Sequence, residues 1–190
     1  MRELSLHILD IAENAISAGA SKVHILVEEN LGADQLRLRV EDNGKGMSPE
    51  MVEAIQDPFV TSRQTRKVGL GIPMLKQAAK ACNGNLEIDS QKGSGTTLEA
   101  VFQHCHIDRM PLGNLADTFI ALEMGSPEVN WVFEYINDDH KFYLDDLQIK
   151  DALDGVCINE PSISAIVRGM ITDGIAAVNQ ATVSQGELNA

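Results

Sequence analysis

Asp10 and Asn14 lie four residues apart near the start of the chain, in the stretch "DIAENAISAGAS". On a helix, side chains at i and i+4 lie on the same face, one turn apart. The amide oxygen of Asn14 could ligate Mg²⁺ beside phosphate oxygens and waters, and a carboxylate one turn earlier could hold a water or accept a hydroxyl proton. The pair could therefore form a face for a phosphate-bearing substrate, with Asn14 as candidate metal ligand and Asp10 as candidate catalytic base.

A second set of residues follows a predicted strand in the stretch "EDNGKGM". Asp42, Gly44 and Gly46 stand there at D-x-G-x-G spacing. The Asp42 carboxylate could accept a hydrogen bond from an amino group such as the exocyclic amine of adenine. The two glycines would let the backbone turn and approach a flat ligand closely. Taken alone, "DNG" is more often a simple turn.

Two further glycine-containing stretches could contact a nucleotide. Gly69 and Gly71 belong to "GLG", at the predicted start of a helix whose free backbone N–H groups could receive phosphate. In "GSGTT", a predicted turn between strands, the hydroxyls of Thr96 and Thr97 could support the nucleotide. Each stretch alone is equally typical of a flexible helix start or a tight hairpin.

The apolar pattern places these four sets at the boundaries of predicted elements. Helical spacing runs from Leu4 to Ala18, and Gly19 stands where that helix would end. A hairpin of strands at 23–27 and 36–40, helices at 48–55 and 70–82, and strands at 85–89 and 96–102 follow. This order predicts a two-layer α/β sandwich that ends near Gln103.

The first helix carries one polar arc opposite its apolar residues. That arc contains His7, Asp10, Glu13, Asn14 and Ser17. A solvated surface is the more common reason for such an arc on an amphipathic helix, so a functional interpretation depends on the other motifs.

Residues 104–190 are predicted to form a small α+β region. The pattern indicates a helix in "PLGNLADTFIALEM", an aromatic hairpin around "NDDH", helices at 145–153 and 162–178, and a frayed tail in "ATVSQGELNA". We expect this region to pack on the first one or on a partner, and to bind a protein, regulate the site or bring two chains together as a homodimer.

In this order, the four motifs closely resemble the boxes of the GHKL superfamily, the ATP-binding fold of DNA gyrase, mismatch-repair ATPases, heat-shock chaperones, histidine kinases and anti-sigma-factor kinases. The resemblance covers about residues 4 to 103 and implies a mixed, mostly antiparallel sheet with helices on one face. It implies Mg²⁺-ATP as the ligand and assigns these roles: Asn14 to Mg²⁺, Asp42 to adenine, Gly44 and Gly46 to the base pocket, Gly69 and Gly71 to a phosphate-covering lid, and Thr96 or Thr97 to the base side.

Other phosphate-binding signatures are missing from the sequence. No G-x-x-x-x-G-K-[ST] or G-x-G-x-x-G occurs. Arg63, Arg66 and Lys67 fall in the expected lid and could neutralise phosphate charge, although a basic loop exposed to water has the same composition.

Position 10 leaves the reaction type open. Related hydrolases and anti-sigma serine kinases usually carry Glu there, and most histidine kinases carry Asn. A base acting on water would give an ATPase, and a base acting on a partner hydroxyl would give a kinase. We expect a stand-alone kinase acting on a protein partner, because the lid and "GLGIPM" look more like those of histidine kinases and anti-sigma kinases. The alternatives are a nucleotide-gated binding module and a slow ATPase of mismatch-repair type, which "ENAISAGASKV" resembles.

Composition limits the partners. The formal net charge of -13 disfavours direct binding to nucleic acid, and no apolar run of about 18 residues predicts membrane insertion. Three scattered cysteines do not suggest a disulfide framework, so we expect a cytoplasmic protein.

Two histidine motifs near residue 105 allow other interpretations. "HIDRMPL" echoes the phosphoacceptor box of histidine kinases at His106, but it lacks the acid after the histidine and follows the ATPase region; the alternative is a chain segment leading into the next helix. In "HCH", His104 and His106 could share a metal, but successive side chains of an extended segment point to opposite sides and no second cluster is near in sequence.

Overall fold

A computed structural model describes residues 2–56, 71–153 and 160–188 of the chain. The helices and strands of these ranges are, in order, α1 (Leu4–Ser17), β1 (Lys22–Asn30), β2 (Gln35–Asp42), α2 (Pro49–Gln56), α3 (Gly71–Ala81), β3 (Asn85–Gln91), β4 (Gly95–Gln103), α4 (Leu115–Gly125), β5 (Asn130–Asn137), β6 (His140–Asp145), α5 (Asp146–Ala152) and α6 (Pro161–Leu188).

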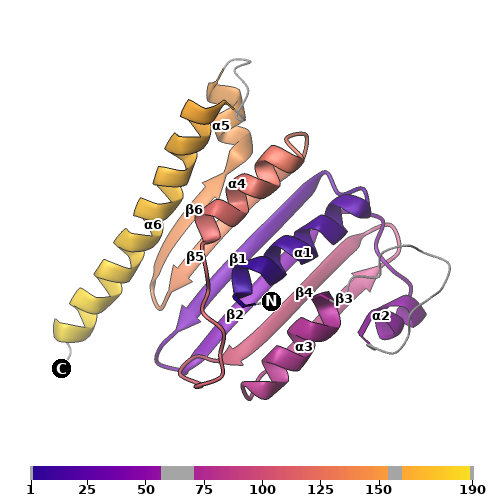
Figure 1. Ribbon diagram of the computed structural model, residues 1–190, viewed down its shortest axis with the longest axis horizontal. Helices are drawn as coiled ribbons and strands as arrows, with labels where there is room; N and C mark the ends of the chain where they lie inside the picture. Colours follow the sequence, from indigo (N-terminus) through magenta and orange to yellow (C-terminus); the bar gives the residue numbers. More distant parts are fainter. Residues whose placement is uncertain (1, 57–70, 154–159, 189–190) are drawn as a thin grey trace.

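The strands form one open sheet in the order β3-β4-β2-β1-β5-β6. Neighbouring strands are antiparallel except β1 and β5, which run parallel. Figure 1 shows α1, α3 and α4 lying across one face of this sheet. The predicted α+β fold, with a mixed and mostly antiparallel sheet and helices on one face, is confirmed.

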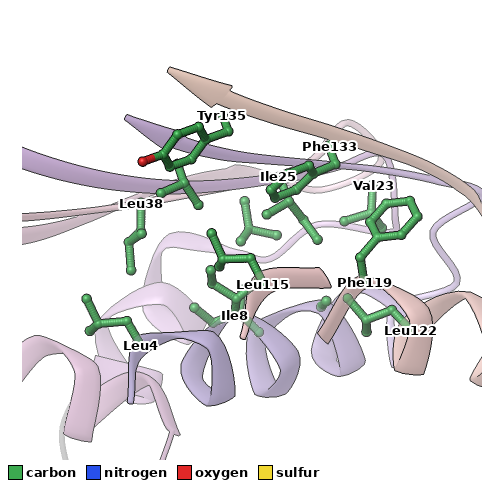
Figure 2. Packing of buried hydrophobic residues seen from close by; sticks show 14 of the residues in the cluster. Leu4, Ile8, Val23, Ile25, Leu38, Leu115, Phe119, Leu122, Phe133 and Tyr135 are labelled. Atoms are coloured by element: carbon green, nitrogen blue, oxygen red, sulfur yellow. The ribbon is translucent and has the colours of Figure 1, made fainter. Parts of the chain in front are cut away.

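The core lies between that sheet face and the helices. Alternate residues of β1, such as Val23 and Ile25, are buried, and they belong to the same core cluster as Leu4 and Ile8 from the apolar face of α1 (Figure 2). The alternation follows from the two-residue period of a strand, and the helix contributes one residue per turn. This packing fixes α1 against the strands, so its polar side chains are held at defined positions.

The C-terminal hairpin extends the same sheet. β5 pairs with β1 so that Phe133 lies beside Ile25, and Phe119 of α4 packs on Phe133 with ring centroids 6.0 Å apart. The cluster of buried residues includes members of both α1 and α4. Residues beyond Gln103 therefore share the sheet and core of the first region, while a domain boundary at residue 103 stays a prediction.

Two predicted boundaries are wrong at the C-terminal side. The tail expected to fray from residue 181 is helical, because α6 continues to Leu188. Thr182 is buried there, and its hydroxyl donates to the Asn137 carbonyl at the end of β5, which ties the helix to the sheet. The helix expected to start at Pro111 begins at Leu115, because the side chain of Asn114 caps it by accepting a hydrogen bond from Asp117 N.

Within the described ranges, no helix, α6 included, has the length and apolar character needed to cross a lipid bilayer.

Candidate functional site

A cavity of about 270 Å³ lies where α1, the loop after β2, and α2 meet the ends of β3 and β4. Its walls are mostly apolar, with few polar side chains, which suits a flat, partly polar ligand. The lining residues are Ile11, Asn14, Ala15, Ser17, Ala18, Val40, Asp42, Lys45, Gly46, Met47, Met51, Ile55, Ile72, Ile88, Thr96 and Leu98.

Asp42 supplies a carboxylate to the cavity wall. It is the last residue of β2 and lies opposite Thr96 of β4 in the sheet register. Asp42 Oδ1 accepts a 2.7 Å hydrogen bond from Gly44 N. Burial raises the pKa of Asp42, and the backbone hydrogen bonds from Gly44 and Thr96 oppose that rise. Backbone donors thus fix this carboxyl group where it can accept a hydrogen bond from an amino group.

The loop after Asp42 requires glycine at position 46. Gly46 has a positive φ of 60°, and a Cβ there would lie 1.9 Å from the carbonyl oxygen of Gln91. At Gly44, a Cβ would meet Asp42 Oδ1 and Ala18 at about 3 Å (2.9 and 3.0 Å). The backbone therefore packs closely against other parts of the chain at both positions, while its approach to a flat ligand stays a prediction.

Asn43, within the same motif, anchors the loop instead of facing the cavity. Its Oδ1 accepts hydrogen bonds from the backbone of Ser21 and Lys22, both 2.9 Å long. Lys45 N also donates to the Ala18 carbonyl. These bonds hold the loop against the turn between α1 and β1. The spacing of the motif gave no sign of this role.

The sheet register distinguishes the two candidate threonines. Thr96 lines the cavity, and its hydroxyl lies 2.8 Å from the hydroxyl of Ser90 on β3. Thr97, the next residue of β4, does not line it, because successive side chains of a strand point to opposite faces. Ser90 also accepts a hydrogen bond from Met47 N, so it links β3 and β4 to the glycine loop. Sequence reasoning did not single out Ser90.

Asn14 and Asp10 take different positions along α1. Asn14 is exposed at the cavity and its side-chain amide is not engaged by any other described residue. Asp10 is outside the cavity lining, and its Oδ2 atom is buried with no hydrogen-bond partner in the described ranges. A Cβ on Gly71 would lie 1.5 Å from that oxygen, so the start of α3 lies directly on the carboxylate. The free amide oxygen of Asn14 fits a metal ligand, and the orphaned oxygen of Asp10 fits a proton acceptor.

His7 differs from other residues of the polar arc. It is only 2% exposed, whereas Glu13 is exposed. Burial lowers the pKa of His7 and the N-terminal amine adds to that effect, while the charge of Asp10 and a backbone hydrogen bond with Gly71 oppose it. His7 therefore belongs to the contact between α1 and the start of α3.

Several predicted residues lie outside the described ranges. These are Gly69, Arg63, Arg66 and Lys67.

The histidines after β4 make separate contacts. His104 Nε2 lies 2.6 Å from Glu29 Oε2 on β1. His106 Nδ1 accepts a hydrogen bond from Asp108 N within its own turn. Among the described residues, no group of three or more His, Cys, Asp or Glu is arranged to hold a metal ion.

Comparison with known proteins gives a family and a set of relatives. The family described as histidine kinase-, DNA gyrase B-, and HSP90-like ATPase matches residues 2–105. The sensor protein kinase FleS of Pseudomonas aeruginosa is 39% identical over 89 residues, which are 47% of this chain and 22% of that protein. The autoinducer 2 sensor kinase/phosphatase LuxQ of Vibrio parahaemolyticus is 31% identical over 100 residues, 47% of this chain and 12% of that protein. The chain thus spans less than a quarter of the length of these two relatives.

A solved structure resembles the fold more widely. The N-terminal domain of a DNA repair protein superposes with a TM-score of 0.51 and 15% identity, covering 76% of this chain and 53% of that one. This share is larger than the part matched by the family, so the likeness in fold continues into the residues after 105.

Proposed function

Because the chain belongs to the family of histidine kinase-, DNA gyrase B- and HSP90-like ATPases, we propose that it binds Mg²⁺-ATP and phosphorylates a protein partner. The observation that carries this proposal is the cavity itself, an apolar slot with the half-buried carboxyl group of Asp42 in its wall. That group would accept a hydrogen bond from the adenine amino group, and Gly46 would let the loop approach the base.

The polar end of α1 would hold the phosphates. Asn14 would ligate Mg²⁺, which when bound would offset phosphate charge. Asp10, one turn away, would take the proton from a hydroxyl of the protein partner as that oxygen attacks the terminal phosphorus. Its buried Oδ2 atom, without a partner in the described ranges, supports this role. Gly71 and, by the resemblance, Gly69 would follow the phosphates at the start of α3.

Phosphoryl transfer can be tested with the purified protein. We expect incubation with γ-labelled ATP, Mg²⁺ and cell lysate to label a partner protein, and Asp10→Asn to reduce the label while ATP still binds. Label on His106 of the chain itself would redirect the proposal to autophosphorylation. Release of free phosphate alone would indicate an ATPase instead of a kinase. If neither labelled protein nor free phosphate is formed, only the nucleotide-binding part of the proposal remains.

A nucleotide-gated binding module is the second candidate, and one observation favours it. The N-terminal N–H groups of α1, at Leu4 and Ser5, donate to the carbonyls of Pro111 and Leu112, in the segment before α4. A displacement of α1 on ATP binding would therefore act directly on the C-terminal elements. Pull-down from lysate with and without ATP, using the Asp10→Asn variant, tests this candidate. A binding module should capture its partner only with ATP, and it should do so even when the variant transfers no phosphoryl group. Light scattering in both states would show whether the captured partner is a second copy of the chain.

A further inference from the structure

A second cavity, of about 480 Å³, lies between the start of α4, the middle of α6 and the β1–β5 strand pair. None of its lining residues belongs to the first cavity. Its polar lining includes Glu29, Tyr135, Thr172 and Asn179, and Leu115 and Ile175 belong to its apolar walls. Neither the motifs nor the proposed kinase function uses this site.

Glu29 is the charged residue of this lining. Its side chain is 13% exposed, and in the described ranges its ion-pair partner is His104, with no lysine or arginine within 4.0 Å. The two carboxylate oxygens contact Tyr135 Oη at 2.5 Å and His104 Nε2 at 2.6 Å. A carboxylate can accept about four hydrogen bonds, so Glu29 retains capacity for a further donor. A carboxylate this buried gains from a permanent cation beside it.

Tyr135 and two asparagines adjoin Glu29 in a chain of hydrogen bonds. Tyr135 Oη donates to Glu29 Oε1 and lies 2.8 Å from the side-chain amide of Asn179, which in turn lies 2.8 Å from the amide of Asn137. Burial and the neighbouring carboxylate raise the pKa of Tyr135 above its usual value, so the hydroxyl stays protonated and neutral. The negative charge at this site is therefore that of Glu29, and a ligand with N–H donors and positive charge would complement it.

We propose that this second cavity binds a primary alkylammonium ion. The ammonium group would donate to Glu29, and the alkyl chain would lie along Leu115 and Ile175. A neutral alcohol of the same length would keep the apolar contacts but lose the charge-assisted hydrogen bond, which is the stronger kind. The proposal does not depend on the nucleotide site.

Isothermal titration of the full chain with n-pentylammonium chloride tests the proposal. We expect saturable binding of one ion per chain, and binding of 1-pentanol at least about tenfold weaker. Glu29→Gln should weaken amine binding by a similar factor. The absence of saturable heat with the wild-type chain, or equal affinity in Glu29→Gln, would overturn the assignment.

A built-in cation provides a test that leaves the buried network intact. Thr172 is exposed on α6 but lines the cavity, so Thr172→Lys can direct its own ammonium group toward Glu29 and should abolish amine binding. Gln180→Lys adds the same charge to an exposed position of α6 outside the lining and should leave binding unchanged. Equal affinity in these two variants would contradict the site.

A capped amino acid distinguishes two sources of the ammonium group, a small amine and the lysine side chain of a polypeptide. If the natural ligand is a small amine, n-pentylammonium should bind at least as tightly as Nα-acetyl-lysine methylamide. Tighter binding of the capped lysine would keep the site but identify its occupant as the lysine side chain of a polypeptide.

Discussion

Asp42 is the acid among the residues that line the first cavity, so recognition of the base proposed to bind there should depend on it. We expect Asp42→Asn to weaken ATP binding at least about tenfold, because a hydrogen bond to a charged group contributes about 1.5–3 kcal/mol and a neutral amide loses most of it. Titration calorimetry with Mg²⁺ measures this change. Glu41→Gln is the matched control, because that exposed neighbour makes the same change of charge outside the cavity. Equal ATP affinity in wild type and Asp42→Asn would refute the adenine assignment.

Gly46 and Gly93 allow the cost of a left-handed backbone to be measured apart from the cost of a steric clash. Both have positive φ, 60° and 81°, but a Cβ at Gly93 meets open space whereas one at Gly46 meets the Gln91 carbonyl at 1.9 Å. We expect Gly93→Ala to cost about 1 kcal/mol of unfolding free energy, the cost of a left-handed residue. Gly46→Ala should cost clearly more and also reduce ATP binding. Denaturant unfolding of both variants measures the difference, and equal losses would show that the loop can move away from Gln91.

The position of single residues at the cavity wall was predictable where sequence spacing alone determines it, while their roles toward a ligand stay predictions. Asp42 and Gly46 follow from the D-x-G-x-G motif, because a strand end and a tight loop impose residue types directly. Thr96 and Thr97 could not be separated before the register of β4 against β2 was known, because a one-residue shift reverses the two faces. His7 was placed in the polar arc of the first helix, and its burial was not predictable, since the sequence does not show that the start of α3 covers that part of α1.

At the scale of elements, a buried acid joins α4, α5 and β5. Glu123 of α4 is 1% exposed, 3.2 Å from the ammonium group of Lys150, which is also 2.6 Å from Asp146. Burial and, next, the neighbouring Asp146 raise the pKa of Glu123 from 4.5 to about 8, with Lys150 opposing the rise. The folded state therefore keeps a proton that the unfolded chain releases above pH 4.5. The resulting stability is complete below pH 4.5 and is lost as pH rises to about 8.

We expect Glu123→Gln to flatten this pH dependence. Within the window, the wild type should lose up to about 1.4 kcal/mol per pH unit relative to the variant, because the amide has no proton to release. Unfolding free energies measured at several pH values between 4.5 and 8 test this difference. Glu128 is exposed in the following turn, and the unfolding free energy of Glu128→Gln should depend on pH as that of the wild type does. A parallel curve for Glu123→Gln as well would show that the acid is already ionised in the folded chain.

Individual helices and hairpins were largely predictable because their signals are local. Helical spacing and Gly19 identify α1, and apolar residues at alternate positions identify β1 and β2. The end of α6 was not predictable, because "ATVSQGELNA" has the polar composition of a tail and is held by the contact of Thr182 with the distant Asn137 carbonyl. Long-range packing decided this element against its local composition.

Across the whole molecule, the parallel pairing of β1 with β5 determines how the two regions behave. No local pattern could have predicted it, since the paired residues, such as Ile25 and Phe133, come from opposite halves of the chain. The pairing makes β1 an interior strand, and α4 covers the sheet beside α1. The site on α1 is therefore supported by elements outside the family match.

This shared sheet predicts one cooperative unfolding transition for the full chain. Trp131 of β5 is the chain's single tryptophan, and its fluorescence reports on the C-terminal elements, whereas loss of ATP binding reports on the N-terminal ones. We expect the two signals to change at the same denaturant concentration. Phe133→Ala should lower the free energy of unfolding by about 3–5 kcal/mol, the cost of emptying a buried phenylalanine site, and shift both signals together.

The truncated chain 1–103, in which β1 loses a neighbour and becomes an edge strand, should lose cooperative melting. If that fragment instead melts cooperatively and binds ATP, the boundary near Gln103 separates two independent domains, and the C-terminal hairpin only docks onto a sheet already complete without it.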